Sequence, residues 1–223
     1  MTRHFEIEID QLRTMLIRMG SLVEEQIDCA VRALVKGDLG LVRLVMDRDK
    51  MVDEYDNTID QQCMKIFALT QPVAVDLRLL MAALKINNEL ERIGDIAVNL
   101  CERVESLAVH LELLRKTQLV VMAESAREMM KLAIDSFVNN DPRLATKVLE
   151  SDDYIDQLDR DTFRLMTKVM KESPEFIEPA VHIVILSRHI ERLADHATNI
   201  AEDVVFLVNA KIIKHHAYES ETE

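Results

Sequence analysis

The sequence predicts an all-α protein made of two tandem, sequence-related three-helix bundles, with six long helices in total. The 223 residues include only four glycines and four prolines, which leaves little turn chemistry for a β protein. Apolar residues recur three and four positions apart through most of the chain, the spacing of helices that turn one face to a core. A motif that begins at Glu91 returns at Glu191, which indicates that one structural unit occurs twice.

Breaks in the apolar pattern divide each half into three helices. Residues 36–38 and 139–142 both place an aspartate before a new helix, where its side chain caps free backbone N–H groups, and Pro142 fits the first helical turn. Further breaks lie at Thr70-Gln71-Pro72 and at Ser173-Pro174, the latter as a serine cap followed by a first-turn proline. The predicted helices span residues 4–35, 39–68, 73–107, 112–138, 142–171 and 175–211.

Short connections between long helices favour antiparallel packing. We expect the first bundle over residues 1–108 and the second over residues 109–223, ending in a loose tail from His215 that lacks periodic apolar residues. Hydrophobic residues make up 48% of the chain, enough to fill a core, so the sequence predicts a folded protein.

The chain is strongly acidic. Its formal net charge is −13, from 40 acidic and 27 basic residues, and repulsion from phosphates argues against a nucleic-acid backbone as the principal partner. The three cysteines form no CxxC pair, which argues against a disulfide framework and favours a reducing, cytoplasmic location. No signal-peptide pattern opens the sequence and no stretch approaches the ~20 apolar residues of a membrane span, so we expect membrane contact only through partners.

The repeated motif carries a row of oxygen ligands. On a helix that turns about 100° per residue, the four oxygen-bearing side chains of each copy fall within an arc of roughly 80°. The rows are Glu91, Asp95, Asn99 and Glu102 in the first half and Glu191, Asp195, Asn199 and Glu202 in the second. The helix before each copy adds an acidic row, Asp49, Asp53, Asp56 and Asp60 in the first half and Asp152, Asp156 and Asp159 in the second.

The acidic rows lie on the opposite side of the predicted helices from the core-facing residues. Like charges at this spacing destabilise a helix by about a few tenths of a kcal/mol per pair, so we expect something to compensate them. One interpretation is a solvated acidic face that Arg92 and Arg103 partly neutralise. The other is a cation bridged between two helices, for which all-oxygen ligation favours iron, manganese, magnesium or calcium, with zinc also compatible.

Other polar residues favour structural roles. His182, His189 and His196 recur every seven residues near the core side of the last predicted helix, which favours packing or interhelical hydrogen bonds over metal ligation. The cysteines are interpreted as buried small apolar side chains. The sequence contains neither a phosphate-cradling glycine loop nor a nucleophile motif, so it indicates no enzyme chemistry.

These residues resemble a known family. The segments Glu91-Arg-Ile-Gly-Asp95 and Glu191-Arg-Leu-Ala-Asp195, the preceding aspartate rows and the stretch from Gln71 closely resemble the PhoU family, accessory regulators of bacterial phosphate-specific transport. The resemblance covers nearly the whole chain. It implies a pair of three-helix bundles, usually dimeric, that carry multinuclear iron or zinc clusters on their surface.

By position, the resemblance implies four metal ligands in each half: Asp49, Asp53, Glu91 and Asp95 in the first, and Asp152, Asp156, Glu191 and Asp195 in the second. Weaker candidates are Asn99, Glu102, Asn199 and Glu202. One departure separates the halves, because Asp60 has Phe163 as its counterpart. The two sites therefore need not bind a metal equally well.

The resemblance also implies a role as a negative regulator of phosphate transport and of the phosphate-starvation response. Such a protein links the ATPase subunit of the phosphate transporter to the phosphate-sensing histidine kinase when phosphate is plentiful. We therefore expect a cytoplasmic, homodimeric, metal-binding adaptor, peripheral to the membrane through its partners, and no enzyme. The alternatives are a metal-dependent helical-bundle enzyme and a purely structural helical interaction protein.

Overall fold

The computed structural model describes residues 2–210, and within them the chain forms helices and no strand. The long helices are α1 (Thr2–Lys36), α2 (Leu39–Leu69), α3 (Ala74–Glu102), α6 (Leu119–Asn139), α7 (Pro142–Glu172) and α8 (Ile177–Asn209). The short elements are α4 (Val104–Leu107), η1 (Ala108–His110), α5 (Leu111–Arg115) and η2 (Pro174–Phe176). The predicted all-α class with six long helices is confirmed.

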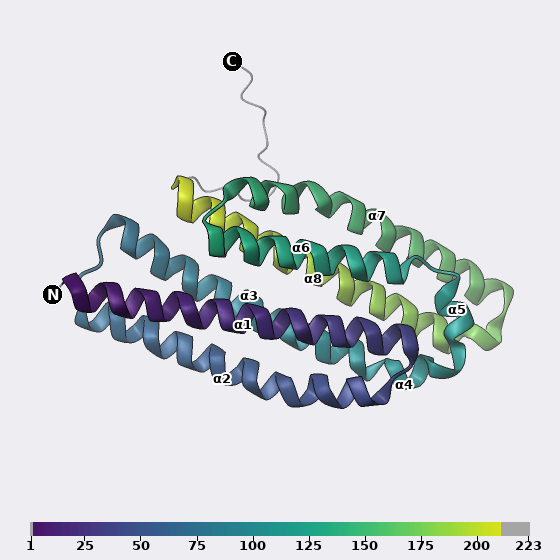
Figure 1. Ribbon diagram of the computed structural model, residues 1–223. Coiled ribbons are helices and arrows are strands. Elements are labelled where there is room, and N and C mark those ends of the chain that lie inside the picture. Colours follow the sequence, from purple (N-terminus) through teal and green to yellow (C-terminus); the bar gives the residue numbers. More distant parts are fainter. Residues whose placement is uncertain (1, 211–223) are drawn as a thin grey trace, which may run out of the picture.

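The long helices form two bundles that lie side by side along a common axis (Figure 1). Helices α1, α2 and α3 pack on one another in the first bundle, and α6, α7 and α8 do so in the second. Between the bundles, α3 packs against α8 and α1 packs against α6. Since α3 and α8 run in opposite directions in Figure 1, the repeated motifs pass each other in antiparallel fashion.

The turn between the first two helices has the same design in both bundles, as the sequence predicts. Asp38 accepts hydrogen bonds from the backbone N–H groups of Gly40 (2.8 Å) and Leu41 (3.4 Å), and Asp141 accepts one from the N–H of Arg143 (2.9 Å). The preceding residue is left-handed in each turn, with φ of 66° at Gly37 and 49° at Asn140. Glycine and asparagine tolerate this conformation better than other residues, so the sequence favours these turns.

The connection between the bundles differs from the prediction. The third helix was expected to reach residue 107, but α3 ends at Glu102, because the Arg103 N–H bonds to the Leu100 carbonyl three residues back (3.2 Å). The expected helix over residues 112–138 is two helices, α5 and α6. Thr117 separates them, since its hydroxyl donates to the Leu114 carbonyl (2.6 Å) and accepts from the Leu119 N–H (3.3 Å).

The start of α8 also corrects the prediction. Ser173 makes no capping hydrogen bond with its side chain, and Pro174 opens the 3₁₀ turn η2 before α8 begins at Ile177. The division of the chain at residues 108 and 109 stays a prediction, and the tail from His215 lies outside the described residues.

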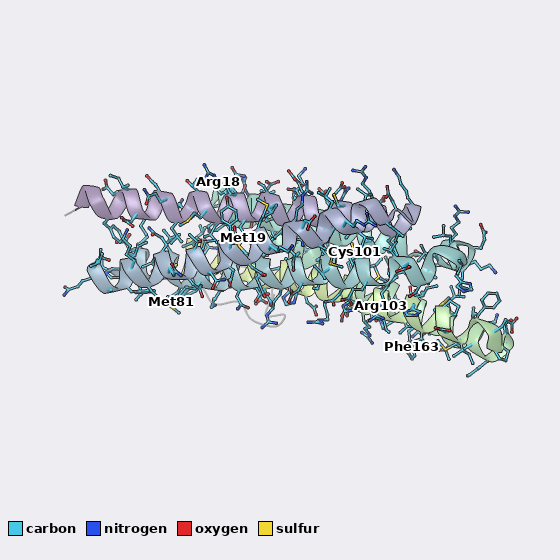
Figure 2. All side chains as sticks on the ribbon, turned by 90° about the horizontal axis from the view of Figure 1, so that it is seen from below. Arg18, Met19, Met81, Cys101, Arg103 and Phe163 are labelled. Carbon is cyan, nitrogen blue, oxygen red and sulfur yellow. The ribbon has the colours of Figure 1, made fainter. Side chains whose placement is uncertain are left out.

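The core follows the predicted apolar stripes. Met19 is fully buried between the helices of the first bundle, whereas its neighbour Arg18 projects from the outer face of α1 (Figure 2). Each bundle buries the apolar faces of three helices, and this burial positions the polar rows on the remaining faces. Among the described helices, none is long and apolar enough to cross a membrane.

Candidate functional site: two acidic ridges

The structure brings the two acidic rows of each bundle together. We call the carboxylates Asp49, Asp53, Asp56 and Asp60 of α2 with Glu91 and Asp95 of α3 the first acidic ridge. The second acidic ridge consists of Asp152, Asp156 and Asp159 of α7 with Glu191 and Asp195 of α8. In each ridge, carboxylates on one helix lie close enough to carboxylates on the other for their charges to affect one another's pKa values.

In the first ridge, the pKa values report this proximity. Burial raises the pKa of Asp49, and the charges of Asp53 and Asp95 raise it further, although a hydrogen bond from Gln26 opposes the shift. Burial likewise raises the pKa of Glu91, with additional contributions from Asp95 and Asp53. Because these effects cross from α2 to α3 and back, the two rows face one another.

A glycine in the motif lets the two helices approach closely. A Cβ atom at Gly94 would lie 3.2 Å from Val52 Cγ1 and 3.3 Å from the side-chain oxygen of Gln26, tighter than ordinary contact. The side chain of Gln26 is fully buried, and its Nε2 donates to Asp49 Oδ1 (3.1 Å). Its Oε1 is buried without a hydrogen-bond partner among the described residues. The first copy of the motif therefore has an amide beneath its carboxylates.

A second buried amide holds the other end of the ridge. Asn87 is fully buried, and its Nδ2 donates to the Oδ1 atoms of Asp56 (2.7 Å) and Asp60 (3.2 Å). Burial and the charges of Asp60 and Asp53 nevertheless raise the pKa of Asp56. The Oδ1 atom of Asn87 is also buried without a partner among the described residues. One amide thus orients two like-charged groups on consecutive turns of α2.

No basic residue neutralises the first ridge directly. Within residues 2–210, no lysine or arginine forms an ion pair with its six carboxylates. Arg92 lowers the pKa of Glu91 slightly against the dominant burial effect, and its Nε donates instead to Asn88 Oδ1 (3.1 Å). Arg103 lies near His189, whose pKa burial and nearby arginines lower. The solvated-face interpretation, with Arg92 and Arg103 as neutralising partners, therefore lacks its ion pairs here.

The second ridge has the same layout with different partners. Burial raises the pKa of Glu191, and Asp195, Asp159 and Asp156 add to this rise while Arg188 opposes it. Burial also raises the pKa of Asp195, followed by the charge of Asp156. As in the first bundle, the rows of neighbouring helices face one another.

One member of the second ridge contradicts the expected outward placement of the acids. Asp159 is only 3% exposed, and its Oδ1 accepts a hydrogen bond from Ser187 Oγ (2.8 Å). Its Oδ2 lies 2.9 Å from Arg188 Nη1, and Asp156 pairs with Arg160 at 3.1 Å. A buried carboxylate needs such partners because desolvation is costly.

The weaker candidates lie nearer to the place where α3 of the first bundle packs against α8 of the second, which we call the seam. Asn199 Nδ2 donates to Glu89 Oε2 (3.1 Å) on α3, and Asn199 and Glu202 line a hollow of about 460 Å³ between α3 and α8. Glu102 lies close enough to His189 for its charge to oppose the lowering of the His189 pKa, and Asn99 is half-buried on α3. The motif therefore divides its oxygens between the ridge and the seam.

The seam includes contacts that the sequence did not predict individually. His196 Nδ1 lies 2.6 Å from Glu89 Oε2, and Lys85 Nζ lies 2.6 Å from Asp203 Oδ1. The interhelical hydrogen bond of His196 agrees with its expected structural role. The Nδ1 atoms of His182 and His189 are buried without hydrogen-bond partners among the described residues.

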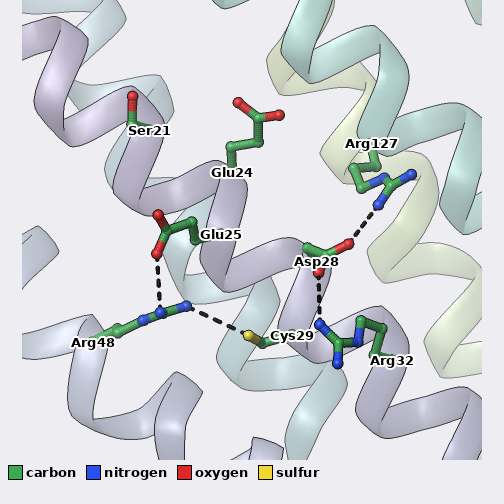
Figure 3. A pocket seen from close by; sticks show the side chains of 8 residues that line it. All are labelled: Ser21, Glu24, Glu25, Asp28, Cys29, Arg32, Arg48 and Arg127. Carbon is green, nitrogen blue, oxygen red and sulfur yellow. Dashed lines mark hydrogen bonds and ion pairs between the residues drawn. The ribbon is translucent and has the colours of Figure 1, made fainter.

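A second hollow, of about 500 Å³, gathers three arginines on the side of α1 that faces α6. Its basic members are Arg32, Arg48 and Arg127 and its acidic members are Glu24, Glu25 and Asp28. Figure 3 shows Asp28 between Arg32 and Arg127, and Arg48 between Glu25 and Cys29. The arginines come from three helices, so sequence spacing gave no signal for them, and their charges are balanced locally.

The ridges supply suitable donors for a hard cation but no preassembled cage. Carboxylate oxygens suit iron, manganese, magnesium and zinc. The raised pKa values reflect burial first and repulsion between carboxylates second, and a cation would relieve the repulsion. Among residues 2–210, no three Asp, Glu, His or Cys side chains converge as a metal site requires. Side-chain rotations within a ridge would therefore have to accompany binding.

Comparisons with known proteins agree with the duplicated architecture. A family model described as the PhoU domain matches residues 16–104 and again residues 119–204. A phosphate-specific transport system accessory protein PhoU homolog from Pseudomonas putida is 34% identical over 96% of this chain and 84% of its own length. A homolog of the same name from Aquifex aeolicus is 37% identical over 93% of this chain and 94% of its own length.

Solved structures show the same fold. The crystal structure of PhoU from Pseudomonas aeruginosa superposes with a TM-score of 0.87 at 33% identity and covers 93% of this chain and 100% of its own. The phosphate transport system regulatory protein PhoU from Streptococcus pneumoniae superposes with a TM-score of 0.83 at 25% identity and covers 95% of this chain and 100% of its own.

Proposed function

We propose that this chain, which belongs to the PhoU family, regulates phosphate transport as a cation-binding adaptor. Its relatives are named accessory proteins of phosphate-specific transport systems, which supports the regulatory role and agrees with the expectation that the chain is not an enzyme. More specifically, the proposed role is negative regulation of phosphate transport and of the phosphate-starvation response. The adaptor links the transporter ATPase subunit to the phosphate-sensing histidine kinase and keeps the phosphate-starvation response off.

The first acidic ridge is the observation that supports cation binding most strongly. Six carboxylates lie on two adjacent helices, and no basic side chain among the described residues pairs with them. Burial first, and then the charges of neighbouring ridge carboxylates, raise the pKa values of Asp49, Asp56 and Glu91. Gln26 and Asn87 each donate a hydrogen bond that orients ridge carboxylates from below. Fixed, like-charged oxygens of this kind favour a divalent or trivalent cation.

The proposed ligands are Asp49, Asp53, Glu91 and Asp95 in the first bundle and Asp152, Asp156, Glu191 and Asp195 in the second, with Asn99, Glu102, Asn199 and Glu202 as weaker candidates. Iron or zinc is the proposed metal, and magnesium or manganese is the alternative. A bound cation would supply positive charge and a cross-link between neighbouring helices. The residues themselves present the oxygens and keep the two rows in register.

The charge of the molecule also supports docking to proteins. The net charge of −13 favours basic patches on partner surfaces, because complementary fields speed encounter and fix orientation. We place the protein in the cytoplasm as a homodimer that meets the membrane through the transporter and the kinase.

The site is tested by the double variant Glu91→Gln, Asp95→Asn. We expect it to contain less metal than the wild type after purification without chelator, because two ligand charges are lost while the helical faces that pack the core are unchanged. Elemental analysis measures metal content, and circular dichroism checks helicity. The matched control is Glu175→Gln, Glu178→Gln, which removes two exposed carboxylates outside the ridges.

Unaltered metal content in the ridge variant would defeat the site assignment. A wild-type protein that is metal-free, with the same melting temperature in the presence of chelator, would favour a purely structural interaction protein. Affinity capture from phosphate-replete cells tests the adaptor role separately. Absence of both the ATPase subunit and the kinase from the captured material would contradict that role.

A further inference from the structure

Three pairs of equivalent positions give the two acidic ridges different charges. Where the second bundle has Arg188, Arg160 and Phe163, the first has Asn88, Asn57 and Asp60. Two cationic side chains and one apolar side chain in the second bundle thus replace two neutral amides and a carboxylate. Phe163, on α7, is 52% exposed (Figure 2).

Arg188 bridges the two rows of the second ridge. Its Nη1 lies 2.9 Å from Asp159 Oδ2 on α7 and 3.6 Å from Glu191 Oε1 on its own helix. A cation held between α7 and α8 would contact carboxylates of these same two rows. Arg160 adds a second positive charge at Asp156, 3.1 Å away. The guanidinium keeps its charge at every physiological pH, so only a competing cation or a structural change removes it.

The equivalent positions of the first ridge carry no such charge. Asn88 accepts a hydrogen bond from Arg92, and Asn57 Nδ2 donates to the backbone carbonyl of Asp53 (2.7 Å). Both side chains are uncharged, so neither competes with a cation for the carboxylates.

The first ridge has, in addition, buried oxygens that lack partners. Gln26 and Asn87 are both fully buried, and the Oε1 of the former and the Oδ1 of the latter have no hydrogen-bond partner among the described residues. The Gln26 oxygen lies 3.3 Å from where a Cβ of Gly94 would stand, between Glu91 and Asp95 in the motif. Such unsatisfied groups are costly, and a bound ion with its water shell satisfies them. In the second bundle the equivalent residues are Met129 and Ser187, and the Ser187 hydroxyl already donates to Asp159 (2.8 Å).

We propose that Arg188 occupies the place of a cation in the second acidic ridge, so that divalent cations fill the first ridge first and enter the second only by displacing this guanidinium. The inference rests on the cation binding proposed above. It assigns the two ridges different tasks, one open to cations and one held closed by the protein's own positive charge.

Titration of the full chain with Mn²⁺ alone tests the inference, with free Mn²⁺ measured by electron paramagnetic resonance. We expect two classes of sites whose dissociation constants for Mn²⁺ differ by about tenfold or more, because one nearby positive charge weakens cation binding by about that factor. Glu91→Gln, Asp95→Asn should remove the tight class, and Glu191→Gln, Asp195→Asn the weak one. Exchanging the equivalent residues should exchange the affinities. Arg188→Asn tightens the weak class about tenfold, and Asn88→Arg weakens the tight class about tenfold.

The outcomes separate the inference from the proposed function. Absence of Mn²⁺ binding in every variant overturns cation binding itself. Binding with equal affinity at both ridges, or affinities that the two exchanges leave unchanged, overturns only the role of Arg188. Because Asp159 is buried, circular dichroism must verify that Arg188→Asn folds. If it does not fold, Asn88→Arg at the exposed α3 position decides the question.

Discussion

At the scale of single residues, buried amides determine how the acidic ridges are built. Gln26 and Asn87 reach from beneath the helices to donate hydrogen bonds to carboxylates that repel one another. Neither amide is part of the repeated motif, and each lies on a different helix from the carboxylate that it contacts. Sequence patterns identified the carboxylates because they share one helical face, but an interhelical partner has no fixed spacing and so left no signal.

The raised carboxyl pKa values predict a pH dependence of stability. Burial and neighbouring charges raise the pKa values of Asp49, Asp56 and Glu91 above 3.8 for the aspartates and 4.5 for the glutamate, so the folded protein binds these protons more tightly than the unfolded chain. Their ionisation therefore opposes folding at neutral pH, and this opposition is relieved as the pH falls through the raised pKa values. We expect metal-free wild type to gain more stability than Glu91→Gln, Asp95→Asn does as the pH is lowered from neutral toward 4.5, the ordinary pKa of a glutamate.

Urea unfolding of both proteins at each pH measures this difference. His189, whose lowered pKa has the opposite effect on acidification, is common to both proteins and cancels in the comparison. Parallel pH profiles for wild type and variant would show that the ridge carboxylates do not repel one another as the structure indicates.

At the scale of helices, the local rules of capping explain most of the element boundaries. The aspartate caps at residues 38 and 141 each follow a left-handed residue, Gly37 or Asn140, that comes directly after the preceding helix. These turns were predictable because each depends on two or three consecutive residues. The break at Thr117 was not, because the apolar spacing continues through it while one hydroxyl redirects the backbone hydrogen bonds. The Ser173 cap failed for a similar reason, since Pro174 begins a 3₁₀ turn instead.

The cap of α2 gives a prediction at this scale. Asp38→Ala should lower the free energy of unfolding by about 1 kcal/mol, because two backbone N–H groups lose their acceptor. Asp38→Asn is the matched control and should cost much less, since asparagine caps a helix nearly as well. Denaturant unfolding at neutral pH measures both. Equal losses for the two variants would assign the effect to the charge of Asp38 and contradict the capping role.

At the scale of the whole molecule, the seam between the bundles joins helices that also carry the ridges. Glu89 on α3 contacts both His196 (2.6 Å) and Asn199 (3.1 Å) on α8. The fold class and the facing rows were predictable from periodicity and duplication. The contacts of the seam were not predictable, because they depend on how the two bundles pack against each other, and no sequence spacing determines that packing.

Neutralising the shared acceptor, Glu89, should weaken the contact between α3 and α8. Glu89→Gln is expected to lower the free energy of unfolding by about 1–2 kcal/mol, since the half-buried His196 and the exposed Asn199 on α8 lose a charged acceptor. Chemical denaturation measures the loss, and a double-mutant cycle with Asn199→Ala isolates the interhelical part. Full additivity in that cycle would show that the α3–α8 hydrogen bond contributes nothing.

Tandem duplication within one polypeptide has a consequence for how such a protein diversifies. In a symmetric assembly of identical single bundles, every substitution would appear in all copies at once, so no subunit could acquire an arginine that its mate lacks. Here the two copies are encoded separately. One can therefore keep an asparagine at position 88 while the other carries arginine at position 188, and a pair of related modules can come to respond to different concentrations of the same ion.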